Sequence, residues 1–435
     1  MKASQSRGRA EAWFRERVIG WVIERTQPLI FMVAFVWRRM LTRTTIIAVT
    51  GSLGKTTTKE CLADVLSSTG TTFRSYRNQN APIAVALNIL RIRPWHRHAV
   101  IEVAGAAPGM MRKSARMLKP DVAIVLNVLR THTTEFTSLE QHAAEKSQLL
   151  DALRPGGIAV VNDDDPRVSD MSIPEGCHAH RFGRTTARGN RIEDVTGAWP
   201  DRLEFTLHVG EASSRVKTQL VGIQWLTSAA AVMTSAVALG IPLDRAADEM
   251  SKASPFPGRL QPVPLPNGAI LLRDDYNASI DTIEASLDVL ANATAERKFL
   301  VMTDMSDFGR NRKQRLKYLG SEAARVADAV VFIGENAEYG VRRAVEAGMS
   351  PGTAHAYPSL QPAAEFLRGE LREGDLVLLK GRTTDHAARI FFAQLGTVKC
   401  WKDYCSKRML CDTCWELGFE AAAPISITPS TAARA

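Results

Sequence analysis

Short apolar runs alternate with stretches of helical periodicity from residue 45 to about residue 250. Buried apolar strands separated by helices favour a mainly parallel sheet that is covered on both faces. We therefore predict an α/β domain over this region. Its strand candidates are Thr45–Val49, Ala99–Val103, Val122–Leu126 and Ile158–Asn162, and Leu139–Leu153 is one of the helices between them.

Residues 176–222 follow a different pattern, in which short alternating strands such as Leu203–Val209 are separated by polar turns. This pattern predicts a small antiparallel addition. An Ala-rich helix over residues 225–240 follows it, and Pro255–Arg259 has the Pro and Gly content of a linker.

The βα alternation resumes after this linker and predicts a second, smaller, Rossmann-like α/β domain. Its strand candidates are Ala269–Leu272, Phe299–Met302, Ala329–Ile333 and Leu376–Lys380. We place the domain boundaries at 1–44 for a basic, apolar helical segment, 45–256 and 257–397 for the two α/β domains, 398–420 for a Cys-rich module and 421–435 for an Ala/Pro/Ser/Thr-rich tail expected to be disordered.

Composition is that of an ordinary globular protein of two or three domains, with 435 residues, 45% hydrophobic and 23% charged. The net charge of +9 is uneven, because residues 1–44 hold nine Lys and Arg against three Glu. Such a basic arm suits an anionic membrane surface or nucleic acid, or serves as a solubilising tail.

The apolar run Leu29–Trp37 has nine residues, whereas about 20 are needed to span a bilayer. Phe14, Val18, Trp21 and Val22 fall on one helical face upstream of it. We interpret residues 11–41 as one or two apolar helices that lie on a membrane, pack on a partner or cover the chain's own core, and the last two are favoured. We expect no signal peptide and a location in the cytoplasm, with the inner face of the membrane as a peripheral alternative.

Four of the six cysteines are clustered, in the spacing C-x₄-C-x₅-C-x₂-C: Cys400, Cys405, Cys411 and Cys414. Four thiols are enough for tetrahedral zinc, and structural zinc is the favoured interpretation. An iron–sulfur cluster and free cysteines are the alternatives, and without an export signal reduced thiols are expected rather than disulfides.

A glycine-rich turn links the first predicted strand to a helix. Backbone N–H groups in such a turn can wrap a phosphate, and the helix N-terminus favours its charge. Lys55 can reach terminal phosphates, and the Thr56 hydroxyl can hold Mg²⁺. Val49 stands where the general pattern has its first glycine, and an ordinary βα turn is the alternative. The predicted nucleotide-binding residues are Gly51, Ser52, Leu53, Gly54, Lys55, Thr56 and Thr57.

The short form T-G-x-x-G-K-T-T-T resembles the Mur ligases, the ATP-dependent amide-forming enzymes of cell-wall synthesis, and most closely their D-alanyl-D-alanine-adding branch. Further segments match landmarks of that family in order. They are Arg77-Asn78-Gln79-Asn80, strand-end Glu102, Asn127 to His132, Ala144-Glu145-Lys146, residues 156–165, Pro257-Gly258-Arg259, Asp274 to Ala278, Thr303-Asp304-Met305 and Leu379 to Arg382.

The resemblance implies that ATP phosphorylates a carboxylate and that an amine attacks the acyl phosphate, so catalysis is mostly positioning and charge stabilisation. Lys55 would hold the β- and γ-phosphates. Thr56 and Glu102 would bind a first Mg²⁺, His132 a second, and Lys146 would become an anionic Mg²⁺ ligand through carbamylation. The alternatives are a capping or ion-paired Glu102, a loop histidine and a solvated helix lysine.

The resemblance also implies a nucleotide site between the domains. Arg259 would contact the phosphates, and Asp274 or Asp275 the ribose. Asn277 would face the nucleotide or cap the next helix. The family's adenine segment departs here, because Trp225 replaces the usual asparagine and would stack on the base instead.

Only 44 residues precede the first predicted strand, so the family's UDP-binding N-terminal domain is expected to be missing. The resemblance then implies an ATP-dependent ligase that joins a carboxylate to an amino acid or other amine outside standard peptidoglycan synthesis, on a polymer, a lipid-linked precursor or a specialised metabolite. The alternative is a non-catalytic nucleotide-binding regulatory subunit of a cell-envelope or biosynthetic complex. Nucleic acid is not an expected partner, because an aromatic platform and a long basic patch are missing.

Overall fold

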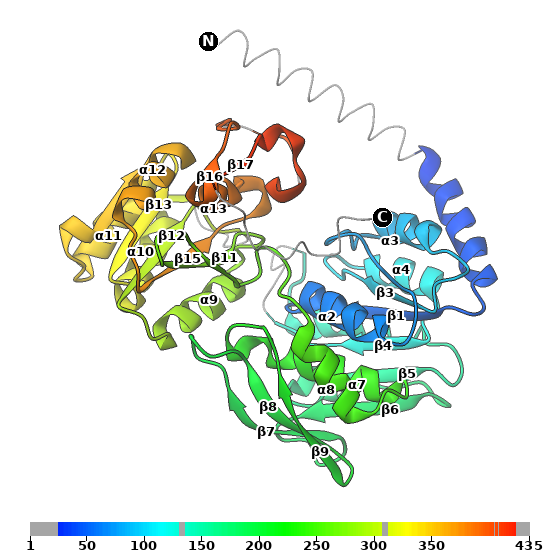
Figure 1. Ribbon diagram of the computed structural model, residues 1–435. Helices are drawn as coiled ribbons and strands as arrows, with labels where there is room; N and C mark the ends of the chain where they lie inside the picture. The colour runs from blue at the N-terminus through cyan, green and yellow to red at the C-terminus, as the bar shows by residue number, and fades with distance from the viewer. Residues whose placement is uncertain (1–24, 130–134, 307–311, 404, 408, 423–435) are drawn as a thin grey trace.

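The computed structural model describes residues 25–129, 135–306, 312–403, 405–407 and 409–422. Two sheets, each covered by helices, form the body of the protein, and a Cys-rich module lies beside α13 of the second domain (Figure 1). The α/β prediction is therefore confirmed.

The first sheet has nine strands in the order β2-β3-β1-β4-β5-β6-β7-β8-β9. From β2 to β7 every pair is parallel, and β7, β8 and β9 are antiparallel. The strands are β1 (Thr45–Thr50), β2 (Thr72–Arg74), β3 (His98–Glu102), β4 (Val122–Val125), β5 (Ile158–Asn162), β6 (His178–Gly183), β7 (Asn190–Thr196), β8 (Glu204–Val209) and β9 (Ala212–Lys217).

Alternation along β1 explains why both faces of this sheet are covered. Ile47 and Val49 belong to the hydrophobic core under one helical layer, and Ile46 and Ala48 to the core under the other. The first layer is α2 (Lys55–Ser67), α7 (Leu226–Ala238) and α8 (Leu243–Lys252); the second is α3 (Pro82–Arg91), α4 (Met110–Leu118) and α5 (Leu139–Ser147), and α6 (Pro166–Ser169) follows β5.

The prediction of a small antiparallel addition over residues 176–222 was partly wrong. β6 extends the parallel sheet beside β5, and only β7 to β9 form an antiparallel meander that continues the same sheet. The alternating pattern showed half-buried strands, but it carried no information on which sheet edge they would join.

The second sheet has six strands in the order β10-β11-β15-β12-β13-β14, and only β10 is antiparallel to its neighbour. The strands are β10 (Gln261–Pro264), β11 (Ile270–Asp274), β12 (Arg297–Met302), β13 (Ala329–Ile333), β14 (Ala354–Tyr357) and β15 (Asp375–Lys380). The helices are α9 (Ile280–Asn292), α10 (Arg312–Val326), α11 (Ala337–Glu346), α12 (Leu360–Glu370) and α13 (Ala388–Leu395).

The Cys-rich module follows α13 and is closed by a short antiparallel pair, β16 (Gly396–Thr397) and β17 (Glu420–Ala421). Val398, Cys411 and Leu417 join the hydrophobic core of the second domain. The module is therefore packed against that domain. The expected tail over 421–435 lies outside the described residues from position 423 onward.

Within the described ranges, none of the helices combines the length and the apolar character needed to cross a bilayer.

Candidate active site

The predicted phosphate loop lies between β1 and α2, and its glycines are required by the backbone. Gly54 has φ +85°, and a Cβ there would lie 2.4 Å from Ser228 Oγ. A Cβ on Gly51 would lie 2.8 Å from the Cβ of Leu126. A side chain at Gly54 would be strained at this φ and would force the Ser228 hydroxyl to move, and one at Gly51 would press on Leu126, so both positions favour glycine.

Loop atoms are held by side chains as well as by the backbone. Asn127 Oδ1 accepts hydrogen bonds of 2.9 Å from the N–H groups of Ser52 and Leu53. Lys55 Nζ donates to the carbonyl oxygens of Gly51 at 2.6 Å and Ser52 at 3.0 Å. Burial lowers the pKa of Lys55, nearby Glu102 opposes that shift, and Arg259 adds to it. The ammonium therefore lies in a desolvated place where a phosphate would be a strong partner.

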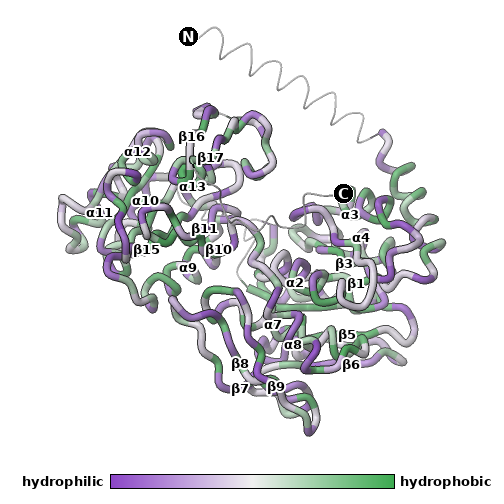
Figure 2. Tube along the Cα trace, in the orientation of Figure 1, coloured by the Kyte–Doolittle hydropathy of each residue, from purple (hydrophilic) through white to green (hydrophobic). Residues whose placement is uncertain are grey.

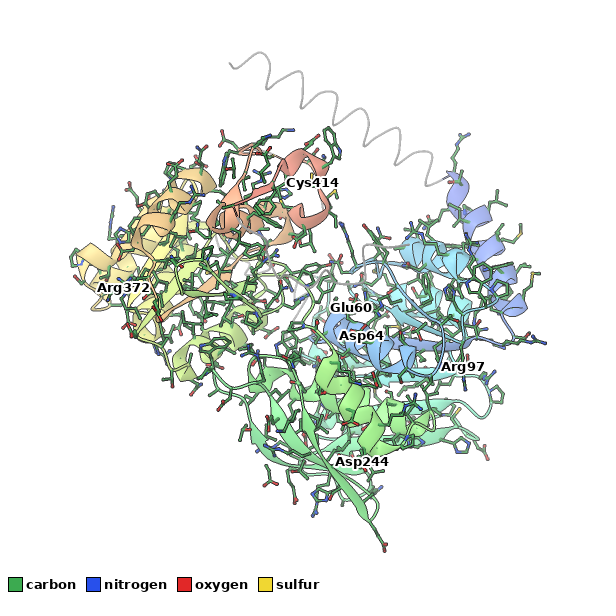
Figure 3. The ribbon with its side chains drawn as sticks, in the orientation of Figure 1. Glu60, Asp64, Arg97, Asp244, Arg372 and Cys414 are labelled. Carbon is green, nitrogen blue, oxygen red and sulfur yellow. The ribbon has the colours of Figure 1, made fainter. Side chains whose placement is uncertain are left out.

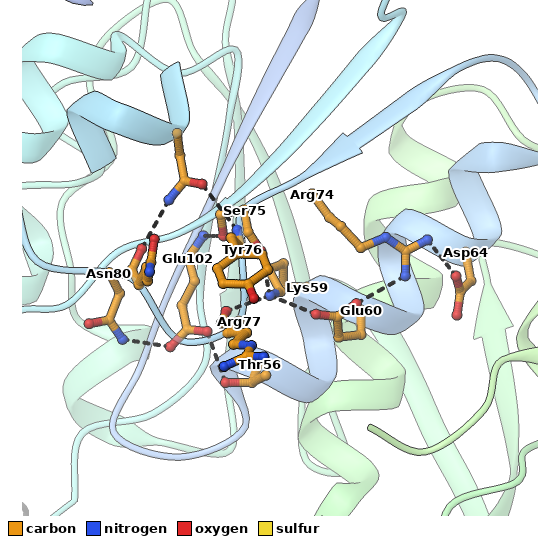
Figure 4. A network of polar contacts seen from close by, with 12 residues as sticks. Thr56, Lys59, Glu60, Asp64, Arg74, Ser75, Tyr76, Arg77, Asn80 and Glu102 are labelled. Carbon is orange, nitrogen blue, oxygen red and sulfur yellow. Dashed lines mark hydrogen bonds and ion pairs between the residues drawn. The ribbon is translucent and has the colours of Figure 1, made fainter. Parts of the chain in front are cut away.

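Glu102 ends β3 and points at the start of α2. Its Oε2 accepts a 2.8 Å hydrogen bond from Thr56 Oγ1, and its Oε1 accepts one of 2.7 Å from Asn80 Nδ2 (Figure 4). Only 2% of Glu102 is exposed. A buried carboxylate beside a hydroxyl fits one face of a Mg²⁺ shell, and phosphate and water oxygens are the usual remaining ligands.

The loop that carries Asn80 is fastened to α2 by a buried lysine. Lys59 Nζ donates to the carbonyl oxygens of Ser75 at 2.8 Å and Arg77 at 2.7 Å, and it pairs with Glu60 at 2.7 Å (Figure 4). Since Lys59 is fully buried, these bonds fix the loop. Sequence reasoning missed this support, because the position of a lysine in a helix does not reveal which loop it will contact.

Lys146 is buried, not solvated, near the end of α5. Its neighbour Glu145 accepts hydrogen bonds from the N–H groups of Gly109 at 2.9 Å and Met111 at 2.7 Å, at the start of α4. Burial lowers the pKa of Lys146 well below its ordinary value; the charge of Lys55 lowers it further, and Glu145 opposes both. Burial and the charge of Lys55 therefore both disfavour the ammonium form of this side chain.

These groups line one cavity of about 280 Å³ between the two domains. Residues of both domains contribute, since Arg259 and Tyr276 follow α8 while the phosphate loop precedes it. The predicted residues in its lining are Gly51, Ser52, Leu53, Gly54, Lys55, Thr56, Thr57, Glu102, Lys146, Trp225, Arg259 and Asn277. Lining residues outside the predicted set are Asn78, Asn80, Ala104, Gly105, Ala106, Tyr276 and Ser279.

Aromatic side chains contribute to this lining. The Arg259 guanidinium carbon lies 4.6 Å from the centre of the Tyr276 ring. Trp225 is 9% exposed, and its indole Nε1 has no hydrogen-bond partner among the described residues. A buried indole N–H without a partner is a donor for a bound group.

Two predicted residues lie away from the cavity lining. Asp274 accepts from Lys380 Nζ and Ser286 Oγ, each at 2.5 Å, and Asp275 is paired with Arg273 at 3.2 Å. Both carboxylates are thus engaged inside the second domain. The remaining predicted residue, His132, lies outside the described residues.

The four clustered cysteines form no disulfide and line one small cavity together with His386 and Arg389. Cys414 is labelled in Figure 3, within the module. Over the described ranges, however, no three or more His, Cys, Asp or Glu side chains are grouped to hold a metal ion. The structure therefore gives the zinc prediction no support.

The comparisons with known proteins agree with this geometry. Residues 49–236 match the Mur ligase middle domain, and residues 258–383 match the glutamate ligase domain of Mur ligases. The chain belongs to the Mur ligase family. Its resemblance to that family, expected from the phosphate loop and the later motifs, is confirmed.

Curated Mur ligases are similar to this chain over most of its length. The UDP-N-acetylmuramoyl-tripeptide–D-alanyl-D-alanine ligase of Escherichia coli K12 is 30% identical over 302 residues, which are 69% of this chain and 66% of that protein. The ligase of the same name from Mycobacterium tuberculosis H37Rv is 28% identical over 356 residues, which are 77% of this chain and 70% of that protein. The chain thus spans about two thirds of the length of these relatives.

Solved structures show the same fold. A crystal structure of MurF from Acinetobacter baumannii has a TM-score of 0.77 at 25% identity, covering 84% of this chain and 80% of that one. MurF from Thermotoga maritima in complex with ADP has a TM-score of 0.71 at 24% identity, covering 84% and 83%.

Proposed function

We propose that this Mur ligase family member uses ATP to join a carboxylate to an amino acid or other amine through an acyl phosphate. The observation that carries the proposal is the single cavity that gathers the phosphate loop, Glu102, Lys146 and Arg259 from two domains. Regulatory nucleotide binding would need the loop alone, whereas this cavity adds an acidic Mg²⁺ ligand and a buried amine.

The charges in the cavity suit a polyphosphate. Lys55 and Arg259 supply positive charge beside the loop amides, and Glu102 with Thr56 would hold Mg²⁺ at the phosphates. The bound Mg²⁺ supplies charge neutralisation at the transferring phosphoryl group. The protein's own contribution is to fix these groups before the reaction, which is where phosphoryl transfer gains most of its rate.

Lys146 would become a second anionic ligand for Mg²⁺ if its amine were carbamylated. A neutral lysine amine can add CO₂, forming the N–C bond of a carbamate and releasing one proton. The burial that lowers the pKa of Lys146 shifts its equilibrium towards the neutral, nucleophilic amine. The carbamate would replace a buried positive charge with hard oxygen ligands for Mg²⁺.

The adenine would lie against Trp225, whose unpartnered indole N–H offers a hydrogen-bond donor to a ring nitrogen. The ribose would be bound near the start of the second domain, where Asn277 lines the cavity. Asp274 or Asp275 would contact it only after exchanging its present partner, Lys380 or Arg273. His132 remains the candidate for a second Mg²⁺.

Product analysis tests the proposal. The full chain is incubated with ATP, Mg²⁺ and mixed carboxylates and amines, including UDP-linked muramoyl peptides, lipid-linked precursors, anionic polymers and free amino acids. We expect ADP and phosphate release that needs both a carboxylate and an amine, together with an amide product by mass spectrometry. Lys55→Ala should abolish both, while Lys113→Ala, on the exposed surface of α4, should leave them unchanged.

A regulatory subunit would behave differently in the same experiment. It would bind ATP with a Lys55-dependent affinity and yet give no amide with any pair of substrates. That result would refute the ligase and favour the regulatory role. The choice of substrates also distinguishes two kinds of ligase: a standard cell-wall ligase would use the UDP-linked muramoyl peptides, whereas the proposed activity would use another carboxylate.

A further inference from the structure

The helix over residues 25–40, here called the N-terminal helix, is fastened to the first domain along one face. Arg38 donates to the carbonyl oxygens of Leu118 at 2.6 Å and Lys119 at 2.9 Å and pairs with Asp121 at 3.3 Å. Trp37 Nε1 donates to the carbonyl oxygen of Ile92 at 3.0 Å. Ala34 and Leu41 are buried in the core that lies under α3 and α4. The helix therefore covers part of the chain's own core.

Its opposite face is apolar and exposed. Among the described residues, six of the eleven exposed large hydrophobic side chains lie on this one helix, which Figure 2 shows at the rim of the molecule. They are Leu29 (57% exposed), Met32 (58%), Val33 (45%), Phe35 (44%), Val36 (53%) and Met40 (65%). A contiguous apolar face of this kind marks a binding surface.

The charged side chains of residues 25–44 are all positive. Arg25 and Arg39 are exposed on the helix and Arg43 just after it, and residues 25–44 contain no Asp or Glu. The Arg39 guanidinium lies over the Phe35 ring at 3.0 Å from its centre. The exposed surface is thus an apolar stripe with cations at both ends.

We infer that the exposed face of the N-terminal helix docks on a membrane surface that carries anionic lipids. A helix lying flat can bury its apolar side chains at the boundary of headgroups and acyl chains while its arginines meet anionic headgroups. Its other face is held by Arg38 and Trp37, so the helix would lie along the bilayer and carry the first domain with it.

A second copy of the chain fits the same face less well. Two copies placed face to face would bring Arg39 and Arg43 of one copy towards the arginines of the other, and residues 25–44 contain no acidic residue to compensate. Like charges across an interface are unfavourable. An anionic surface is the complement that the charges require, and the inference does not depend on the proposed ligase activity.

Vesicle flotation with the full chain tests the inference. The wild type should float with vesicles of phosphatidylcholine and phosphatidylglycerol and far less with phosphatidylcholine alone, and added salt should weaken the binding. The triple variant Met32→Ser, Phe35→Ser, Val36→Ser should lose more than about tenfold in partitioning, because three apolar side chains leave the bilayer. The matched control is Trp95→Ser, Ile223→Ser, Trp415→Ser, which removes three apolar side chains that are exposed even more fully elsewhere and should float like the wild type.

Thermal unfolding of each variant shows whether it is folded, and all six positions are exposed enough for the fold to survive. Equal flotation of the helix variant and the wild type would overturn the inference, as would failure of the wild type to float with the anionic vesicles. A concentration-dependent dimer that the helix variant abolishes, without flotation of the wild type, would assign the face to a second copy.

Discussion

Arg273 pairs with Asp275, which precedes the cavity residues Tyr276 and Asn277, and with Asp412 of the Cys-rich module. Its replacement should lower both the stability of the fold and the affinity for ATP. The guanidinium is 2% exposed and contacts Asp275 at 3.2 Å and Asp412 of the module at 2.7 Å. It also lies 4.4 Å from the centre of the Phe391 ring. The charge and the packing of this side chain therefore hold β11 to the module.

The loss of stability in Arg273→Met follows from the two carboxylates that would lose their partner. Asp275, also 2% exposed, would lose its cation, and the two carboxylates would face each other across the gap. Breaking a buried ion pair on one side costs about 3–5 kcal/mol. A typical total stability is about 5–15 kcal/mol, so the loss would be large. Asp412→Asn leaves Arg273 paired with Asp275 and should cost about 1–3 kcal/mol.

Urea unfolding and nucleotide affinity are the measurements. The matched control is Arg297→Met, because Arg297 pairs with Asp375 at 2.7 Å and Glu370 at 2.8 Å at the start of β12, away from the cavity. Both variants should be destabilised, but only Arg273→Met should also raise the Kd for ATP. A loss of stability under about 1 kcal/mol for Arg273→Met, or equal ATP affinities of the two variants, would refute the reasoning.

Three further changes test other contacts. Gly54→Ala should abolish ATP binding measured by calorimetry, because the new methyl would lie 2.4 Å from Ser228 Oγ at a positive φ; normal affinity would show that the loop is not so tightly held. Glu102→Gln keeps a group that can accept from Thr56 but loses the charge, so Mg²⁺ titrations of ATP binding should shift to higher Mg²⁺, and an unchanged titration would exclude Glu102 as a ligand. Acidification should destabilise the fold, because burial and Arg97 lower the pKa of His98 below 6.5. The folded chain then binds fewer protons than the unfolded one, so stability is present above pH 6.5 and falls as the pH drops through it. Melting temperatures at about pH 7.5 and 5.5 should differ less in His98→Gln, and an equal difference would place the titration elsewhere.

Strand positions could be predicted well from the sequence, because parallel strands buried on both faces are continuous apolar runs. Ile158–Asn162 and Ala329–Ile333 lie where the pattern placed them. The edge of the first sheet was less predictable, since a half-buried strand such as β6 pairs according to tertiary packing that alternation does not encode.

The site could be predicted from the sequence where a residue type is required by the chemistry and stands in a recognisable motif. The loop, Glu102 and Lys146 were identified by motif, and the structure brings them to one cavity. Contacts between segments far apart in sequence were not predictable, such as those of Lys59 with the loop after β2 or of Asp412 with Arg273. The N-terminal helix shows the same limit. Its apolar run is compatible with burial or exposure, and only packing decides which face is buried and which is exposed.

An isotope transfer experiment tests the central claim most directly. The carboxylate substrate found in the product screen is labelled with ¹⁸O in its carboxyl group, and the phosphate released from ATP is analysed by mass spectrometry. An acyl phosphate requires a carboxylate oxygen to attack the γ-phosphorus and to leave with the phosphate when the amine attacks, so the account predicts one ¹⁸O atom in each phosphate, lost in Lys55→Ala. Unlabelled phosphate beside an amide product would contradict it.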